Sequence, residues 1–139
     1  MRGSGGLTRR QFGTLSVGMG LSMLLPTAAN AQAVTEVDVD VSTPDGTADC
    51  YFVHPSSGEK PGVIIWPDIL GLRPSFRMMG RRLAESGYSV LVVNPFYRDS
   101  RAPVVPEGAS FQDDETRNIV LPLARSLNAE THMTDARAF

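Results

Sequence analysis

The sequence has a single cysteine, Cys50, so no disulfide can form within the chain. It has only two histidines, His54 and His132, and they form no cluster with cysteine of the kind that binds zinc. We therefore expect a domain that depends on a buried apolar core and has no metal site. Burial is also expected for Cys50, which alternates with Ala48 and Phe52 along an apolar segment.

Positive charge is scarce once the first 31 residues are set aside. Residues 32–139 carry 10 Lys and Arg against 15 Asp and Glu, a net charge of −5. Such a mildly acidic domain lacks the basic surface that binds nucleic acid, so we expect no nucleic-acid partner. The chain contains no internal repeat and no low-complexity tract, and its length suits one domain at most.

The first 31 residues have the three-part pattern of an export signal, with a basic start, an apolar middle and a small-residue end. The sequence TRRQF at 8–12 resembles the twin-arginine motif, and the A-x-A sequence at 29–31 supplies a cleavage site. The apolar run 12–25 is shorter than the roughly 20 residues that span a bilayer, which favours a cleaved signal over a membrane anchor. We therefore expect a periplasmic or secreted protein, with residues 32–139 as its mature part and only transient membrane contact through the signal.

Four segments have the patterns of β-strands. Residues 34–43 alternate apolar and polar side chains, and residues 47–55 follow the turn signal TPDG, so the two are expected to form an antiparallel hairpin. Residues 63–66 (VIIW) and 88–93 (YSVLVV) are apolar runs rich in β-branched residues, which is typical of strands buried on both faces of a parallel sheet. A sheet made of these segments alone would leave an apolar edge at 88–93.

Between the two apolar runs, residues 73–87 change to a helical period. Pro74 stands near the expected first turn and Gly87 just past the expected end, where each residue type is favoured. A strand, a helix and a second apolar strand in this order predict a βαβ unit with a right-handed crossover. The helix face that packs on the sheet is expected to be formed by Phe76, Met79, Leu83 and Ala84.

The second half of the sequence is less regular. Residues 96–110 contain two prolines, Pro103 and Pro106, and predict a long excursion without helix or strand. Residues 113–128 predict a helix with acidic residues in its first turn, which Pro122 either kinks or divides. Residues 131–139 begin another helix that has neither a glycine cap nor a following proline, so we interpret the chain as the N-terminal portion of a longer protein.

The segment PGVIIWPDILGLRPSFRMMGRRLAESGYSVLVVNPFYR, residues 61–98, carries a family resemblance. It resembles the dienelactone hydrolase-like proteins of the α/β-hydrolase superfamily, in which a buried strand, an acidic residue, an apolar loop with glycine, a helix and a second strand follow in this order. The resemblance implies the N-terminal part of an α/β-hydrolase fold, with an antiparallel hairpin leading into a parallel βαβ unit and then helices. It also implies hydrolysis of an ester or lactone through an acyl-enzyme, with a small-molecule substrate and no metal or cofactor.

The family resemblance further implies a nucleophile on a G-x-[CS]-x-G elbow, followed by an aspartate and a histidine. The sequence contains no such elbow, and the family order places it after Phe139. We therefore expect residues 1–139 alone to be inactive. Asp68 corresponds to the acidic residue that in the family contacts the nucleophile, and the backbone N–H of Ile69 to a donor of the oxyanion hole. Arg117 matches the family's arginine that grips the substrate carboxylate, although Leu121 replaces a nearby tyrosine.

Several of these residues have a second interpretation. Asp68 is also suited to shaping a turn, because a carboxylate readily accepts hydrogen bonds from neighbouring backbone N–H groups. Tyr97 and Arg98, after the apolar strand at 88–93, are candidates to line a pocket for an anionic substrate, but a surface loop also explains them. For the whole chain, the alternatives are a non-catalytic flavodoxin-like binding module and a truncated gene remnant without a stable fold.

Overall fold

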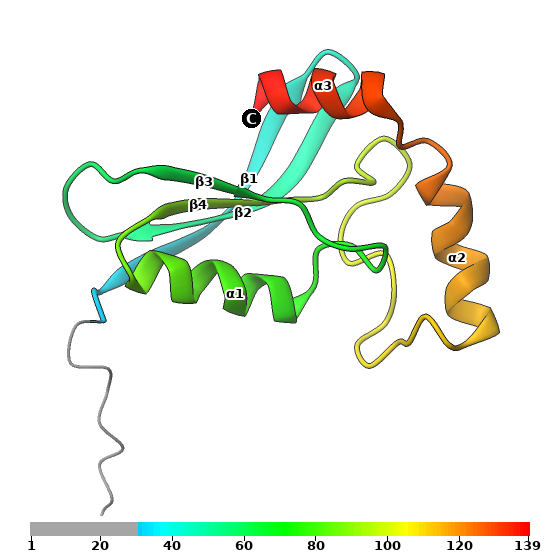
Figure 1. Cartoon of the computed structure of the whole chain (residues 1–139), viewed down its shortest axis with the longest axis horizontal. Helices are drawn as coiled ribbons and strands as arrows, with labels where there is room; N and C mark the ends of the chain where they lie inside the picture. Colours follow the sequence, from blue (N-terminus) through cyan, green and yellow to red (C-terminus); the bar gives the residue numbers. More distant parts are fainter. Residues whose placement is uncertain (1–30) are drawn as a thin grey trace, which may run out of the picture.

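The structure is a computed structural model and describes residues 31–139, so the predicted signal lies outside the described residues except for Ala31 (Figure 1). Within them, the elements follow in the order β1 (Val34–Thr43), β2 (Gly46–Pro55), β3 (Gly62–Ile65), α1 (Pro74–Glu85), β4 (Ser89–Val93), α2 (Asp114–Ala124) and α3 (Ala129–Ala138). Figure 1 shows α1 on one side of the sheet and α3 on the other, with α2 beyond an irregular excursion. The arrangement confirms the predicted α/β class.

The sheet has the strand order β1-β2-β4-β3. β1 and β2 pair antiparallel along their full length and close in a tight turn, as the TPDG signal predicts. The pairing of β1 with β2 confirms the predicted hairpin. β4 pairs antiparallel with β2 and parallel with β3, and the parallel pair confirms the strand–helix–strand unit. The prediction of a free edge at 88–93 is wrong, because β4 has a partner on each side; in the described part of the chain the edges are β1 and β3.

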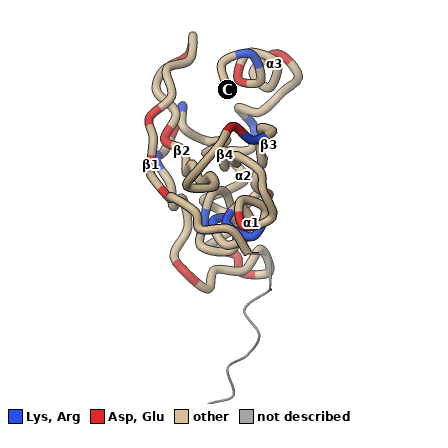
Figure 2. The backbone as a smooth tube through the Cα atoms, turned by 90° about the vertical axis from the view of Figure 1, so that its left-hand side faces the viewer, with Lys and Arg blue, Asp and Glu red and all other residues tan. Residues whose placement is uncertain are grey.

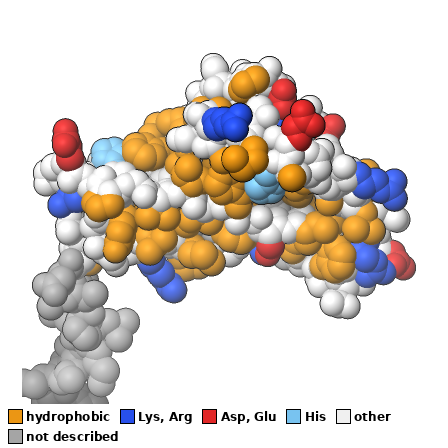
Figure 3. Space-filling model, turned by 45° about the horizontal axis from the view of Figure 1, so that its top comes forward, with side chains coloured by type: hydrophobic (Ala, Val, Ile, Leu, Met, Phe, Trp, Pro, Cys, Tyr) orange, Lys and Arg blue, Asp and Glu red, His pale blue; other side chains and the backbone are white. Residues whose placement is uncertain are grey.

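β3 differs from its prediction as a strand buried on both faces. Its side chains alternate between exposed and half-buried, and Ile64 is 37% exposed. The reason is that α1 covers one face of the sheet, whereas α3 covers only part of the other. In Figure 3, apolar side chains gather beside α3 on this open face. A shallow groove there is lined by Phe52, Ile64, Leu91 and Phe139, among others.

α1 packs against β2 and β4 through an apolar core centred on Tyr51, Val53, Ala84, Val90 and Val92. Gly80 allows the close approach, because a Cβ built at this position would lie only 3.0 Å from a methyl carbon of Val92. The prediction that Met79 belongs to the buried face is wrong: it is 48% exposed, and Gly80 takes the place against the sheet. Pro74 and Gly87 stand at the helix ends as predicted, and Gly87 has a φ of 103°.

Charged side chains connect α1 to the outer strand of the hairpin. Figure 2 shows acidic positions along β1 and basic positions on α1. Arg77 lies 2.7 Å from a carboxylate oxygen of Asp38, and Arg81 lies 3.0 Å from one of Glu36. These pairs are largely exposed, so each contributes little to stability, but their spacing follows the two-residue period of β1.

The excursion after β4 is held to the sheet by buried polar groups. Asn94, fully buried, donates to Asp49 at 2.9 Å and accepts from the backbone N–H of Phe96 at 3.0 Å. The other oxygen of Asp49 accepts from the N–H of Ala102 at 2.7 Å. These contacts order a segment without regular structure, and they keep it close to the carboxyl end of β3.

The two C-terminal helices follow the sequence pattern more closely. α2 continues through Pro122 to Ala124, so the proline does not divide the helix. α3 begins at a capping box: the side chain of Asn128 accepts from the N–H of Thr131, whose hydroxyl accepts from the N–H of Asn128. Its inner side packs over a second core of Ala48, Cys50, Val93 and Tyr97, with Trp66 and Phe139 beside it.

Candidate active-site loop

The loop that leaves β3 and reaches α1 is organised around Asp68. The Asp68 carboxylate accepts from the N–H of Leu70 at 3.0 Å, and its backbone carbonyl accepts from the N–H of Gly71 at 2.9 Å. The second contact closes the four-residue turn 68–71, and Gly71, its last residue, has a φ of 74°, which favours glycine. The Asp68 carboxylate, three residues after β3, therefore shapes the loop.

Arg73 fixes the same carboxylate from the other side of the loop. Its guanidinium donates to both oxygens of Asp68, at 2.6 and 2.9 Å, and to the carbonyl of Gly71 at 3.1 Å. The guanidinium also stacks over the ring of Phe76 at 4.9 Å. The hydrogen bonds from Arg73 lower the pKa of Asp68, so this carboxylate is ionised and paired at neutral pH. A pair of this kind disfavours Asp68 as a proton acceptor.

The backbone N–H of Ile69 is free of hydrogen bonds within the described part of the protein. Leu70 and Gly71 donate to Asp68, whereas within residues 31–139 the N–H of Ile69, like those of Asp68, Leu72 and Arg73, has no protein acceptor. An oxyanion-hole donor needs a free N–H at the carboxyl end of a strand, held in place before the reaction begins. The position of Ile69 in a closed turn meets this requirement, and its role in an oxyanion hole stays a prediction.

Arg117, the predicted carboxylate-binding residue, lies in the first half of α2. Its guanidinium donates to the backbone carbonyls of Phe111 and Gln112, at 2.9 and 2.6 Å, and pairs with Asp114. These contacts join the end of the excursion to the helix. The structure thus gives Arg117 a local structural role, and the substrate-binding role stays a prediction.

Tyr97 and Arg98 take part in a buried polar cluster with α3. Arg98 donates to both oxygens of Asp135, at 2.6 and 3.0 Å, and to Asp45 in the hairpin turn at 2.6 Å. The Tyr97 hydroxyl lies 2.8 Å from Asp135 and 2.8 Å from the hydroxyl of Thr43. These contacts tie three distant segments together, while the predicted pocket for an anionic substrate stays untested.

Sequence reasoning missed two of the residues that organise this region. Arg73 is five positions from Asp68 and directly precedes the proline that starts α1. A guanidinium and a carboxylate so close in sequence could have predicted an ion pair across the loop. Asp135 had no such signal, because it stands on the buried side of a short helix and its partners are 37 and 38 positions away. Its side chain is only 3% exposed.

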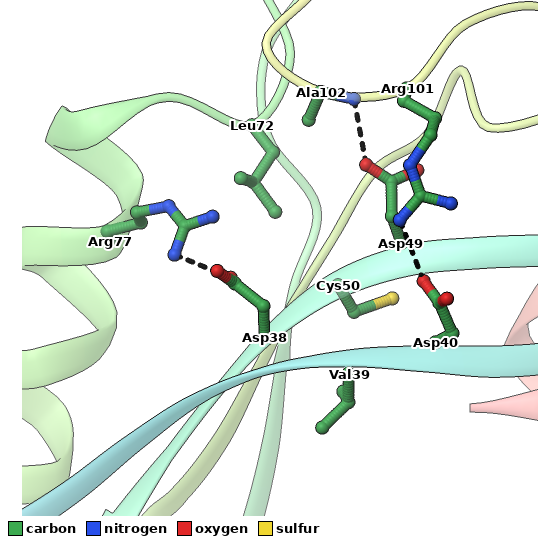
Figure 4. Close-up of a pocket in the computed structure, with 9 residues that line it drawn as sticks. All are labelled: Asp38, Val39, Asp40, Asp49, Cys50, Leu72, Arg77, Arg101 and Ala102. Carbon is green, nitrogen blue, oxygen red and sulfur yellow. Dashed lines mark hydrogen bonds and ion pairs between the residues drawn. The ribbon is translucent and has the colours of Figure 1, made fainter.

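A cavity lies between β1 and α1, beside Arg101 and Ala102 of the excursion (Figure 4). It has a volume of 270 Å³, and two ion pairs cross its margin: Asp38 with Arg77, and Asp40 with Arg101 at 3.0 Å. Cys50 reaches this cavity but is only 3% exposed. Burial raises the pKa of its thiol to about 11, so it stays protonated and is a poor nucleophile. Its predicted burial is confirmed.

Within residues 31–139, no group of three or more His, Cys, Asp or Glu side chains is arranged to hold a metal ion. No helix of this part is long and apolar enough to cross a membrane.

The sequence model of the dienelactone hydrolase family matches residues 48–136, from β2 to α3. The chain belongs to the dienelactone hydrolase family. The match includes the whole loop from Trp66 to Arg73 and the excursion that packs beside it. No match to the chain was found among curated proteins.

Solved structures of this family share the fold. One is the crystal structure of a dienelactone hydrolase from Klebsiella pneumoniae, with 16% identity, a TM-score of 0.61 and 77% of this chain covered. Another is a dienelactone hydrolase-like promiscuous phosphotriesterase from metagenomic libraries, with 21% identity, a TM-score of 0.51 and 76% of this chain covered. The aligned region is 42% of either structure's length, so this chain spans less than half of these family members.

Proposed function

We propose that residues 32–139 form the N-terminal part of a hydrolase that cleaves an ester or lactone bond through an acyl-enzyme. Membership of the dienelactone hydrolase family supports this proposal. The observation that carries it is the free N–H of Ile69, at the carboxyl end of a parallel strand, where open α/β sheets bind their ligands. The substrate is a small molecule.

In this proposal the loop supplies half of an oxyanion hole. Charge develops on the carbonyl oxygen of the substrate as the tetrahedral intermediate forms, and a fixed N–H stabilises that charge without rearranging. The closed turn holds Ile69 in place, and the pairing of Asp68 with Arg73 removes a free negative charge that would oppose the oxyanion. Asp68 then acts as a supporting residue that shapes the loop.

The nucleophile, the triad aspartate and the triad histidine are proposed to lie on chain that follows residue 139. The unpaired edge of β3 offers the backbone groups with which the next strand would pair, and the open apolar face beside it would be covered at the same time. Under this proposal residues 1–139 alone do not hydrolyse esters. Clear turnover of p-nitrophenyl butyrate by this chain would contradict the proposal.

A sharper test uses the longer protein that this proposal requires, in which the chain continues past residue 139. Ile69 is the second residue of the turn at 68–71, a position where proline is favoured, so Ile69→Pro removes the N–H with little change in backbone shape. We expect kcat to fall about 10²- to 10³-fold, as for loss of one oxyanion donor. Ile69→Ala keeps the N–H and is the matched control. Equal activity of the proline and alanine variants would exclude Ile69 from the oxyanion hole.

We also propose that residues 1–31 are a twin-arginine-type export signal that delivers the protein to the periplasm or the medium. The support is the sequence pattern of residues 8–12 and 29–31. Replacing Arg9 and Arg10 together by lysine should block export and leave the uncleaved protein inside the cell. Cell fractionation and N-terminal sequencing would show whether cleavage occurs after Ala31.

A further inference from the structure

A cavity of 380 Å³ lies between the N-terminal end of α1 and the excursion. Most of its wall is apolar and irregular, because prolines and small residues from both segments meet there. The wall on the excursion side contains no helix or strand, so a ligand in the cavity would break no helix or strand hydrogen bond there. Its main lining residues are Arg73, Pro74, Pro103, Val105, Pro106 and Ala109.

The cavity adjoins the candidate active-site loop. Arg73 forms part of its wall and at the same time binds the Asp68 carboxylate through both oxygens. The loop and the excursion also meet directly, since a Cβ built on Gly71 would lie 3.1 Å from a methyl carbon of Val104. The cavity and the loop that carries the N–H of Ile69 therefore share Arg73 and lie against the same excursion.

The charges around the loop disfavour an anionic ligand. Arg73 is paired with Asp68, Arg98 with Asp45 and Asp135, Arg101 with Asp40, and Arg117 with Asp114 and two backbone carbonyls. Each of these four guanidinium groups is thus already bound to a carboxylate. The other charged residue that lines the cavity is Glu107, which would repel a carboxylate.

We propose that this cavity receives the apolar acyl group of a neutral ester, so that the substrate carries no carboxylate of its own. The inference rests on the proposed hydrolase function and names the substrate class for the same site. A hydrocarbon group lowers its free energy when it leaves water and packs against the proline-rich wall. It needs no free cation as a partner. A carboxylate would have to displace Asp68 from Arg73 to find a partner.

Binding is tested on the whole chain of residues 1–139, so that it is measured apart from turnover. Ethyl hexanoate, a neutral ester, is titrated into ¹⁵N-labelled protein, and hexanoate is titrated separately as the anion. We expect the ester to shift the amide signals of Ser75, Val105 and Ala109, and hexanoate to bind at least ten-fold more weakly. Equal or tighter binding of hexanoate would overturn the proposal.

The location is tested with Ser75→Trp, which places a large side chain in the cavity from an exposed position of α1. Ser57→Trp is the matched control, because Ser57 is also exposed but lies in the turn before β3 and does not line the cavity. We expect at least ten-fold weaker ester binding only for Ser75→Trp, with circular dichroism showing that both variants are folded. If Ser75→Trp misfolds, Ala109→Leu replaces it as a smaller filling substitution. Unchanged binding in a folded cavity variant would overturn the proposal.

Two outcomes separate this inference from the proposed function. If the longer protein hydrolyses p-nitrophenyl butyrate but Ser75→Trp leaves its preference for acyl length unchanged, the function stands and the cavity assignment fails. If the chain binds ethyl hexanoate in the cavity but the longer protein hydrolyses no ester, the binding site stands and the proposed function fails.

Discussion

Arg98 binds both carboxylate oxygens of Asp135, which joins the loop after β4 to α3 across 37 positions of sequence. The pair is largely shielded from water, with the Asp135 side chain 3% exposed and that of Arg98 14% exposed. Hydrogen bonds in such surroundings are strong, but leaving one member unpaired is costly. This pair therefore helps to fix the position of α3 on the rest of the fold.

Asp135→Asn should destabilise the protein by about 2–3 kcal/mol, because it removes the negative charge that compensates a buried guanidinium. Asp45→Asn is the matched control: it removes a partner of the same Arg98 that is 42% exposed, and should cost less than about 1 kcal/mol. The measurement is urea unfolding followed by circular dichroism and by the fluorescence of Trp66, the only tryptophan. Similar losses for the two variants would show that burial does not govern this cluster.

The pair between Asp68 and Arg73 should make the loop sensitive to acid. The pKa of Asp68 is lowered in the folded protein, so its contribution to stability is present above the unfolded value of about 3.9 and is lost as the pH falls through the folded pKa. Asp68→Asn should cost about 1 kcal/mol at pH 7, since the carboxylate is 51% exposed, and the difference from wild type should shrink below pH 4. Unfolding curves between pH 3 and pH 7 test this; a difference that is constant with pH would contradict it.

Gly71 should tolerate substitution less well than another glycine of similar backbone conformation. Gly71 and Gly58 have φ values of 74° and 75°, so an alanine is strained at either position. At Gly71 the added Cβ also meets Val104 at 3.1 Å, whereas at Gly58 it meets only the flexible end of Lys60, at 3.8 Å. We expect Gly58→Ala to cost about 1 kcal/mol and Gly71→Ala about 1 kcal/mol more. Equal losses in urea unfolding would mean that the excursion moves aside without cost.

Cys50 should be unreactive in the folded protein. Burial raises the pKa of its thiol to about 11, so at pH 8 only about one molecule in a thousand carries the thiolate that reacts with disulfide reagents. We expect labelling by a chromogenic aromatic disulfide to be at least 100-fold slower in native protein than in 8 M urea. Fast labelling under native conditions would reveal local opening of the hairpin core. In the longer protein, Cys50→Ala should leave ester hydrolysis unchanged.

Most of the elements could be predicted because their patterns are local. The alternation of residues 34–43 and the TPDG turn predict the β1–β2 hairpin, and proline and glycine at the ends of α1 predict its extent to within two residues. The errors concern burial. Met79 and Ile64 are apolar and fit the expected faces, but exposure depends on which element covers each face of the sheet. An apolar pattern shows what is able to be buried, and the neighbouring elements decide whether it is.

The candidate site shows the same difference between what local sequence patterns predict and what tertiary packing decides. The sequence alone determined that Asp68 follows a strand and lies in a glycine-containing loop, because strand, turn and helix signals are encoded within a few residues. Only the tertiary structure decided that Arg73 neutralises Asp68, that the N–H of Ile69 stays free, and that Arg98 is bound by carboxylates 53 and 37 positions away. Charged side chains pair when they lie close together in space, and that distance depends on how the sheet and the excursion pack. A local sequence pattern does not contain this information.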